Sequence, residues 1–295
     1  MFAIIGILVV FGAVVGGFLM EKGKLLVLLQ PAELVIIGGA ALGTVLIANP
    51  PHILGKIAKG LLAAFKGSRY NKDWYLKSLK LMFDLFDQSR RSGLATLETD
   101  VEEPEKSKIF ANYPGIVKDH HLLMFICDTL RTMLVGNVEA FDIDQMMETD
   151  MEIHHHGATE PVAALSSMAD SLPGLGIVAA VLGVVITMGA LGGPPEEIGH
   201  KVAAALVGTF LGILLCYGLI GPLAASMAKE AEAEHAYYHV LRVCLTAFNK
   251  GIPPMMAADM GRRAIPGHLR PKFQDMEAVC RNRSAAAAPS AEAAA

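Results

Sequence analysis

Four long apolar stretches constrain the fold of this chain more than any other feature of its sequence. They cover residues 2–20, 33–49, 171–193 and 202–226. A helix needs about 20 apolar residues to cross the hydrocarbon core of a bilayer. The composition agrees, because 53% of the residues are hydrophobic and only 18% are charged, against about 25% charged in a soluble domain. The sequence therefore predicts an all-α membrane protein with four transmembrane helices.

Basic residues beside these stretches indicate their orientation, because Lys and Arg in short flanking loops stay in the cytoplasm. The loop after the third stretch offers only Lys201 beside two glutamates. The segment after the second stretch is far more basic, and begins with Lys56, Lys59, Lys66, Arg69 and Lys72. We therefore expect the large central segment and both termini to be cytoplasmic, although Lys22 and Lys24 in the first outer loop weaken the bias.

The pattern divides the chain into five parts. Transmembrane helices 1 and 2 fall in residues 1–50, a cytoplasmic helical domain in 51–168, and transmembrane helices 3 and 4 in 169–227. A cytoplasmic helical segment follows in 228–283, and the alanine-rich tail 284–295 has too little bulky apolar surface to order itself. Within the central domain, residues 52–67 form a basic amphipathic helix suited to a membrane surface, and residues 138–156 form a separate helix.

Several function classes are excluded by composition. A net charge of -4 gives no reason to expect nucleic acid as a partner. The 4 cysteines contain no CxxC pair, and no phosphate-binding GxxxxGK[ST] is present. The run IHHHG at 153–157 is a poor metal site, because consecutive helical side chains point about 100° apart; a polar helix end is the favoured interpretation. We expect no cofactor, no metal and no enzymatic reaction.

The spans lack the group that an ion carrier needs. Apart from Glu33 and Asp170 at their edges, they contain no Asp, Glu, Lys, Arg or His, whereas transporters normally keep an ionisable residue in the membrane. The chain is therefore expected to form a wall around a carboxylate from another subunit. Thr209 is the main polar group of the fourth span. It either bonds to a carbonyl one turn earlier or lines an aqueous path opposite Ala180.

Proline and glycine recur within the spans. Pro173 and Pro222 each remove a backbone donor and kink a helix, and both are expected at the same inner level of the bundle, as static kinks or as a pair of hinges. Glycines occur in all four spans and allow close helix approach. Intramolecular packing explains any single pair, while their abundance favours additional packing against copies of the chain or another helix.

Three stretches carry a resemblance to a known family. DSLPGLGIVAAVLGVV and VGTFLGILLCYGLIGPLA, preceded by SRRSGLATLETDVEEPEKSKIFANYP, closely resemble the flagellar motor stator A subunits, the MotA branch of the MotA/TolQ/ExbB proton channel family. The likeness runs from the first span to about residue 280. It implies a multi-pass protein of the bacterial inner membrane. It also implies five copies around two MotB-type B subunits, whose membrane aspartate supplies the missing carboxylate for a translocated proton.

The resemblance also assigns roles to individual residues. The prolines that match Pro173 and Pro222 couple protonation of that aspartate to movement. Arginine at Arg90 and glutamate at Glu98 engage the rotor protein FliG, with Arg91 as a further candidate. From the sequence alone these charged side chains are expected to form a solvated face. Arg90 and Glu98 would be separated by roughly 12 Å if the helix is continuous, and Gly93 is a position where the helix could bend. Asp150 is a further acidic candidate for the same surface.

Ion choice is predicted from one position. Sodium-driven relatives look to have threonine where this chain has Ala180, with a second at the position of Thr209. A lone hydroxyl makes a poor site for a hard cation that binds several oxygens. The sequence therefore predicts proton coupling.

Two other functions remain open at this point. One is an ExbB- or TolQ-like subunit that energises envelope transport or constriction, and those relatives look to have three spans. The other is a structural membrane scaffold without ion flux.

Overall fold

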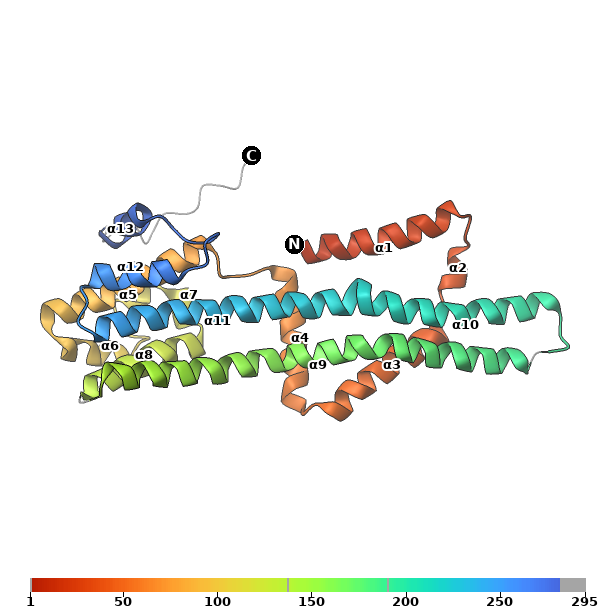
Figure 1. The fold of residues 1–295 in the computed structure, drawn as a ribbon, viewed down its shortest axis with the longest axis horizontal. Coiled ribbons are helices and arrows are strands. Elements are labelled where there is room, and N and C mark those ends of the chain that lie inside the picture. Colours follow the sequence, from red (N-terminus) through yellow and green to blue (C-terminus); the bar gives the residue numbers. More distant parts are fainter. Residues whose placement is uncertain (1, 137, 190, 282–295) are drawn as a thin grey trace. The chain divides into compact units, whose positions relative to one another are not determined.

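The fold is described by a computed structural model that covers residues 2–136, 138–189 and 191–281. Throughout these residues the regular structure is helical, without strands (Figure 1). The chain forms two compact units, a membrane unit of Met1–Ser68 and His156–Ala231, and a polar unit of Arg69–His155 and Glu232–Ala295. The tail predicted at 284–295 lies outside the described residues.

The membrane unit contains the helices that are long and apolar enough to span a bilayer. Its elements are α1 (Phe2–Met20), α2 (Leu25–Leu28), α3 (Pro31–Ala48), α4 (Pro51–Lys66), the later part of α9 (Ala140–Met188), α10 (Pro195–Leu215), the π-helical segment η3 (Cys216–Ile220) and the first part of α11 (Gly221–Asn249). By length and composition, the described residues contain 4 candidate spans. The predicted all-α class with four transmembrane helices is confirmed.

The polar unit is a compact bundle of shorter helices. Its elements are α5 (Lys72–Ser92), η1 (Leu94–Leu97), α6 (Glu98–Glu102), η2 (Phe110–Asn112), α7 (Pro114–Val117), α8 (His120–Val135), the first part of α9, the last part of α11, α12 (Pro254–Ala264) and α13 (Phe273–Arg281). Side chains cap two of them, since Asn71 accepts from the Trp74 amide before α5 and Asp119 accepts from the Leu122 amide before α8.

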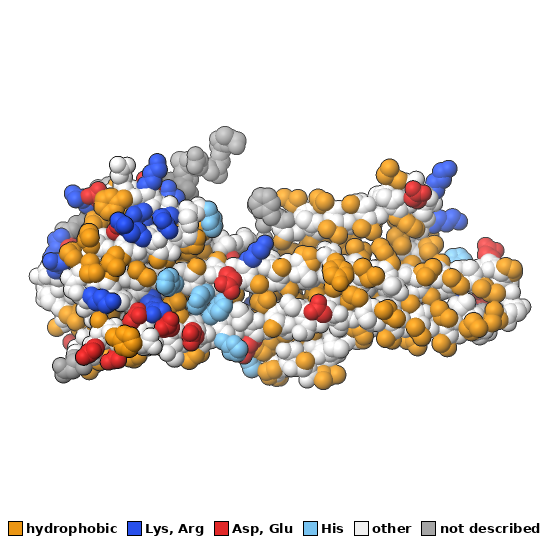
Figure 2. Space-filling model, viewed as in Figure 1, with side chains coloured by type: hydrophobic (Ala, Val, Ile, Leu, Met, Phe, Trp, Pro, Cys, Tyr) orange, Lys and Arg blue, Asp and Glu red, His pale blue; other side chains and the backbone are white. Residues whose placement is uncertain are grey.

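Aromatic and ionic contacts hold the polar unit together. Phe86 of α5 stacks on Phe248 of α11 with ring centroids 4.2 Å apart, and the fully buried Tyr237 hydroxyl lies 2.7 Å from that of Ser78. Figure 2 shows charged side chains gathered over this unit, while hydrophobic side chains cover the faces of α1 and α10 in the membrane unit.

The helix predicted to end at the histidine run does not end there. α9 continues through Pro161 and Pro173 to Met188, so the predicted polar helix end at 153–157 is wrong. Pro161 deprives the carbonyl of Gly157 of its usual donor, and Lys56 Nζ of α4 donates to that oxygen at 3.0 Å. A side chain 101 residues away thus supplies the hydrogen bond that the proline removes.

The predicted domain boundaries at 50, 168, 227 and 283 refer to a membrane surface and remain predictions. The two compact units instead divide α9 between His155 and His156, and α11 between Ala231 and Glu232. By this division the basic helix α4 belongs to the membrane unit.

Candidate functional site

The closest helix contact in the membrane unit joins α9 to α10 through glycines. A Cβ built on Gly212 would lie 2.5 Å from the Leu172 carbonyl oxygen and 3.0 Å from the Gly176 Cα. A Cβ on Gly176 would in turn lie 2.9 Å from the Gly208 carbonyl oxygen. These atoms belong to the backbone, so any larger residue would push the helices apart. Three of the predicted glycines therefore serve packing within the chain.

This contact brings two of the predicted path residues together. A Cβ built on Gly208 would lie 3.3 Å from the Ala180 amide nitrogen, and Thr209 follows Gly208 directly. Ala180 and Thr209 are both half-buried, on adjoining turns of α9 and α10. Thr44 and Thr187 donate to carbonyls three and four residues earlier, both at 2.8 Å. Among the described residues Thr209 makes no such bond, which leaves its hydroxyl available for the predicted aqueous path.

The helix around Pro222 departs from α geometry. Residues Cys216–Ile220 form a π-helical segment, and the Gly221 amide donates to the Cys216 carbonyl five residues earlier. Proline cannot donate a hydrogen bond, so a regular α-helix here would leave the Gly218 carbonyl without its donor. A single wide turn of this kind inside an α-helix is often found at functional sites. The kink predicted at Pro222 is thus a π segment.

The sequence predicted that Pro173 and Pro222 lie at one level of the bundle, but the structure places them at different levels. The carbonyl just before Pro173 faces Gly212, whereas Ala224, shortly after Pro222, packs in one buried cluster with Leu165. Because α9 and α10–α11 run antiparallel, Pro222 lies about two turns nearer to Leu165 than Pro173 does. The two kinks are therefore staggered along the bundle.

Glu33 lies inside the bundle, although the sequence placed it at the edge of a span. It stands in the first turn of α3, but its side chain is only 6% exposed. A Cβ built on Gly208 would lie 2.8 Å from Glu33 Oε2. Asp170, the other acid of the predicted edges, is exposed.

Other small residues of the spans have open space beside them in the part of the chain that the structure describes. A Cβ built on a glycine of α1 or α3 meets no atom within 4 Å at Gly12, Gly16, Gly39 or Gly43. Large apolar residues are also exposed on these helices, among them Leu8 at 67% and Ile47 at 88%. Both faces are available to lipid, to copies of the chain or to another helix.

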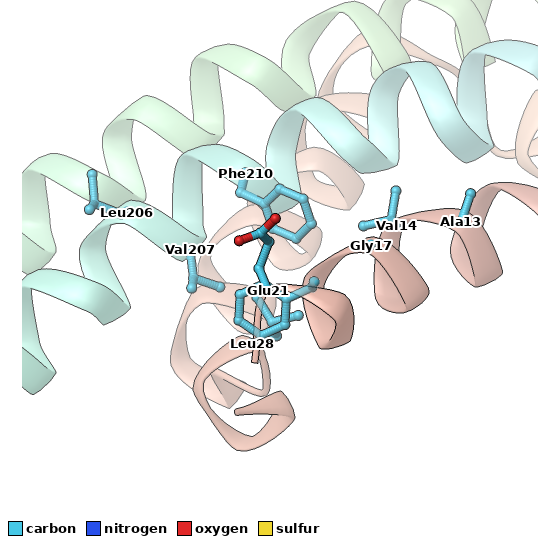
Figure 3. Close-up of a pocket in the computed structure, with 9 residues that line it drawn as sticks. Ala13, Val14, Gly17, Glu21, Leu28, Leu206, Val207 and Phe210 are labelled. Carbon is cyan, nitrogen blue, oxygen red and sulfur yellow. The ribbon is translucent and has the colours of Figure 1, made fainter. Parts of the chain in front are cut away.

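An apolar cavity of about 530 Å³ lies between α1, α2 and α10 (Figure 3). Its lining includes Phe18, Leu28, Val207 and Phe210, and Figure 3 shows the Glu21 carboxylate among them. None of the predicted path residues lines it, so we do not assign the ion path to this cavity.

The predicted rotor-facing charges lie on two helices of the polar unit. α5 ends at Ser92, and Gly93 then takes a φ of 90°, a conformation that favours glycine, before η1 and α6. Arg90 and Glu98 are exposed, and neither forms an ion pair with any residue that the structure describes. Arg91, by contrast, pairs with Asp87 at 2.9 Å. The chain bends between the two charges at Gly93.

Asp150 is not brought to these charges by any described contact. It lies on α9 one turn before His154, whose ring nitrogen is 3.6 Å from a Glu234 carboxylate oxygen. Glu234 in turn lies 3.2 Å from Arg69, just before the start of α5. Arg90 is at the opposite end of α5, so Asp150 and Arg90 occupy different parts of the polar unit.

A group of histidines in the polar unit was not anticipated from the sequence. Rings of His121 and His154 lie 5.3 Å apart and those of His155 and His235 lie 4.5 Å apart. These histidines come from α8, α9 and α11. In the sequence, only the run at 154–156 indicated that histidines lie close together. Within the described residues no group of three His, Cys, Asp or Glu side chains could hold a metal ion.

A buried carboxylate pairs with two arginines within α12 of the polar unit. Asp259 is 6% exposed and accepts hydrogen bonds from Arg262 at 2.7 Å and Arg263 at 2.8 Å. Burial by itself raises the pKa of this carboxyl, but the hydrogen bonds from the two arginines outweigh burial and hold the pKa below its usual value.

Comparison with known proteins decides the family. Residues 4–93 match the family model described as motility protein A N-terminal, and residues 118–239 match the MotA/TolQ/ExbB proton channel family. Motility protein A of Escherichia coli is 41% identical over 277 residues, covering 94% of each chain. The chain belongs to the motility protein A family. The chemotaxis protein LafT of Vibrio parahaemolyticus is 37% identical over 92% of this chain and 96% of its own.

Solved structures agree with the fold of a motility protein A. The C. jejuni MotAB structure has a TM-score of 0.74 at 18% identity, covering 90% of this chain and 95% of that chain. The Bacillus subtilis MotAB stator complex has a TM-score of 0.71 at 22% identity, covering 93% and 98%. The resemblance drawn from the sequence is confirmed.

Proposed function

We propose that this motility protein A is the A subunit of a flagellar motor stator in the bacterial inner membrane. In this proposal both termini are cytoplasmic, and five copies surround two MotB-type B subunits. Proton flow through the complex is converted into rotation of the rotor. No covalent chemistry is required.

The observation that carries this proposal is the match over 94% of both this chain and its Escherichia coli relative. Relatives from several bacteria bear the name motility protein A. The 4 candidate spans favour a stator subunit over an ExbB- or TolQ-like subunit, for which three spans are expected.

A B subunit is supported by what the membrane unit leaves incomplete. Beside Ala180 and Thr209, the stretches 171–189 and 202–215 contain no Asp, Glu, His, Lys or Arg. The two facing helices therefore bring no acid of their own, and Glu33 of α3 is the carboxyl of the described residues that reaches this surface; a B subunit would supply the acid that the facing helices lack. The glycine faces of α1 and α3, where a Cβ would meet no described atom within 4 Å, are suited to packing against neighbouring copies and partner helices.

The coupled ion in this proposal is the proton. Thr209 is the only hydroxyl residue of 202–215, and Ala180, on the adjoining turn of α9, carries no oxygen in its side chain. Sodium would require several oxygen ligands at one point, and this pair offers one.

Movement is proposed to arise at the two prolines. A proton that crosses 100 mV releases about 2.3 kcal/mol, which is enough to shift a two-state helix arrangement substantially. The π segment before Pro222 is the part of the fourth span that lacks regular α-helical hydrogen bonds. Pro173 lies within α9 about two turns away and removes one of its backbone donors. Changing the charge of the B-subunit carboxylate would alter the balance between two arrangements of these segments.

The rotor contact is proposed at the end of α5 and the start of α6. Arg90 and Glu98 are exposed and not engaged in ion pairs with described residues. They are therefore free to meet opposite charges on FliG without first breaking an internal contact. Arg91 already has a partner in Asp87, which makes it the weaker candidate. Asp150 lies in another part of the unit and is kept only as a secondary candidate.

Complementation tests this proposal in a flagellated strain that cannot swim because it lacks its own A subunit. The chain, expressed with its B subunit, is expected to restore swimming that does not depend on sodium.

Pro173→Ala is expected to leave assembly with the B subunit intact while rotation stops, because the helix regains its missing donor. Normal torque from Pro173→Ala would contradict the hinge role. Swimming that stops when sodium is withdrawn at constant proton gradient would contradict proton coupling. A structural scaffold would restore neither swimming nor proton flux.

A further inference from the structure

Glu33 is an ionisable side chain buried in the helix bundle of the membrane unit. It is 6% exposed. Among the residues that the structure describes, none forms a hydrogen bond with its buried Oε2 atom. An ionisable residue at membrane depth is costly to retain, and such residues usually mark an ion or proton pathway.

The placement of Glu33 follows from the packing of α3. The buried residues of this helix are Glu33, Ile37, Ala41 and Val45, each four residues after the last, so they form one face. Ile37 and Ala41 are fully buried in a cluster that includes Ala179 of α9. The carboxyl is therefore the first member of the stripe by which α3 packs against the bundle.

Glycine on the neighbouring helix makes room for the carboxyl. A Cβ on Gly208 would lie 2.8 Å from Glu33 Oε2, 3.2 Å from the Ala179 Cβ and 3.3 Å from the Ala180 amide nitrogen. Oε2 and the backbone of Ala180 therefore approach the same point, next to Thr209. The carboxyl thus reaches the surface that we propose as the ion path.

One other carboxylate lies near this surface, because Glu21 lines the apolar cavity together with Val207 and Phe210 of α10, but Glu21 is exposed whereas Glu33 is buried. The facing stretches 171–189 of α9 and 202–215 of α10 contain no Asp, Glu, His, Lys or Arg. On the chain before α3, the nearest charged residues are Glu21, Lys22 and Lys24, all outside the helix. α4, which also contacts α3, carries its charges at His52, Lys56, Lys59 and Lys66, beyond the far end of α3 from Glu33.

We propose that Glu33 is a proton-binding site of the chain itself, on the outer side of the path beside Ala180 and Thr209. This inference rests on the proposed function. A proton from the outer side bonds to Oε2 and gives a neutral carboxylic acid. The O–H bond then breaks, and the proton passes inward to the carboxylate of the B subunit, leaving Glu33 ionised again. The A subunit thereby provides an acid of its own in addition to the one that its partner brings.

The test uses the complete complex of the chain with its B subunit, reconstituted into vesicles. Glu33→Gln keeps the size of the side chain and removes its titration, and Glu33→Asp keeps a carboxyl. Glu196→Gln is the matched control, because Glu196 is an exposed carboxylate at the start of α10. Proton flux is measured over a range of external pH, and assembly is measured by co-purification with the B subunit.

We expect Glu33→Gln to assemble normally and to lower proton flux by about tenfold or more, since a positioned proton-transfer group contributes about 10²–10⁴. Glu33→Asp should recover much of the flux, with a changed dependence on external pH. Glu196→Gln should match the unaltered complex. A merely structural role for Glu33 would not move the pH profile.

Unchanged flux and an unchanged pH profile in Glu33→Gln would overturn the inference while leaving the proposed function intact. If Glu33→Gln does not assemble, Glu33→Asp decides: a pH profile identical to that of the unaltered complex overturns the proposal, and a shifted one supports it. If the unaltered complex conducts no protons at all, the proposed function itself fails.

Discussion

Substitution of Gly212 by alanine tests the α9–α10 contact on which the candidate path depends. The new methyl group would lie 2.5 Å from the Leu172 carbonyl oxygen and 3.0 Å from the Gly176 Cα, whereas ordinary contact begins at 3.4 Å. Both opposing atoms belong to the backbone, so no rotamer change can relieve the clash. The helices must separate locally by close to one ångström.

Such overpacking costs about 1–3 kcal/mol, and each 1 kcal/mol lowers the thermal midpoint by about 2–4 °C in proteins of this size range. The assay heats detergent-solubilised complexes and measures the fraction that still elutes as an assembly. Gly199→Ala is the matched control, because Gly199 is an exposed residue of the same helix and a Cβ there meets nothing within 4 Å. Swimming speed should fall for Gly212→Ala, because the displaced backbone lies beside Pro173. Equal midpoints and equal swimming for the two variants would refute the packing argument.

Two further predictions concern the polar unit. Arg90→Glu should reduce swimming several-fold more than Arg91→Glu, because only Arg90 is free of an internal ion pair; equal effects would count against a rotor contact at Arg90. Asp259→Asn should lower the free energy of unfolding of the polar unit by about 1.5–3 kcal/mol, the value of hydrogen bonds to a charged group, as measured by hydrogen exchange of the α12 amides. Because the folded pKa of Asp259 is lowered, this stabilisation is complete above the unfolded pKa of about 3.9 and is lost as the pH falls through the folded value. The variant and the unaltered protein should therefore converge in acid, and a difference that persists there would contradict the assignment.

The apolar helices could be predicted from the sequence because their formation is a local property. The first predicted span, 2–20, has the bounds observed for α1. The second predicted span begins at Glu33 rather than at Pro31, a difference of less than one turn. In each case length and hydrophobicity determined the prediction.

Features that depend on distant partners could not be predicted in this way. The histidine run suggested a helix end, but the helix continues because Lys56 supplies the hydrogen bond that Pro161 removes. No residue near Pro161 in the sequence indicates this contact. The burial of Glu33 likewise depends on a glycine far along the chain, Gly208. The spacing of glycines alone did not distinguish Gly212, which packs against α9, from Gly39, which faces no other residue.

The same reasoning applies to the candidate path. Ala180 and Thr209 could be paired from the antiparallel order of two spans, and the structure brings them to adjoining turns. The relative height of Pro173 and Pro222 depends on how the two helices are shifted along each other. That shift is set by side-chain packing, and counting residues from the span ends gave the wrong level.

The π segment has a consequence for the length of the fourth span. A wide turn holds one residue more than an α-helical turn of the same height, so Cys216–Ile220 absorbs a residue that a regular helix would not accommodate. Deleting a single residue there would leave the helical phase of the flanking segments nearly unchanged. The same deletion within α10 would rotate everything beyond it by about 100°. This short segment is thus the place in the span where the chain can lose a residue while the helices on either side keep their relative orientation.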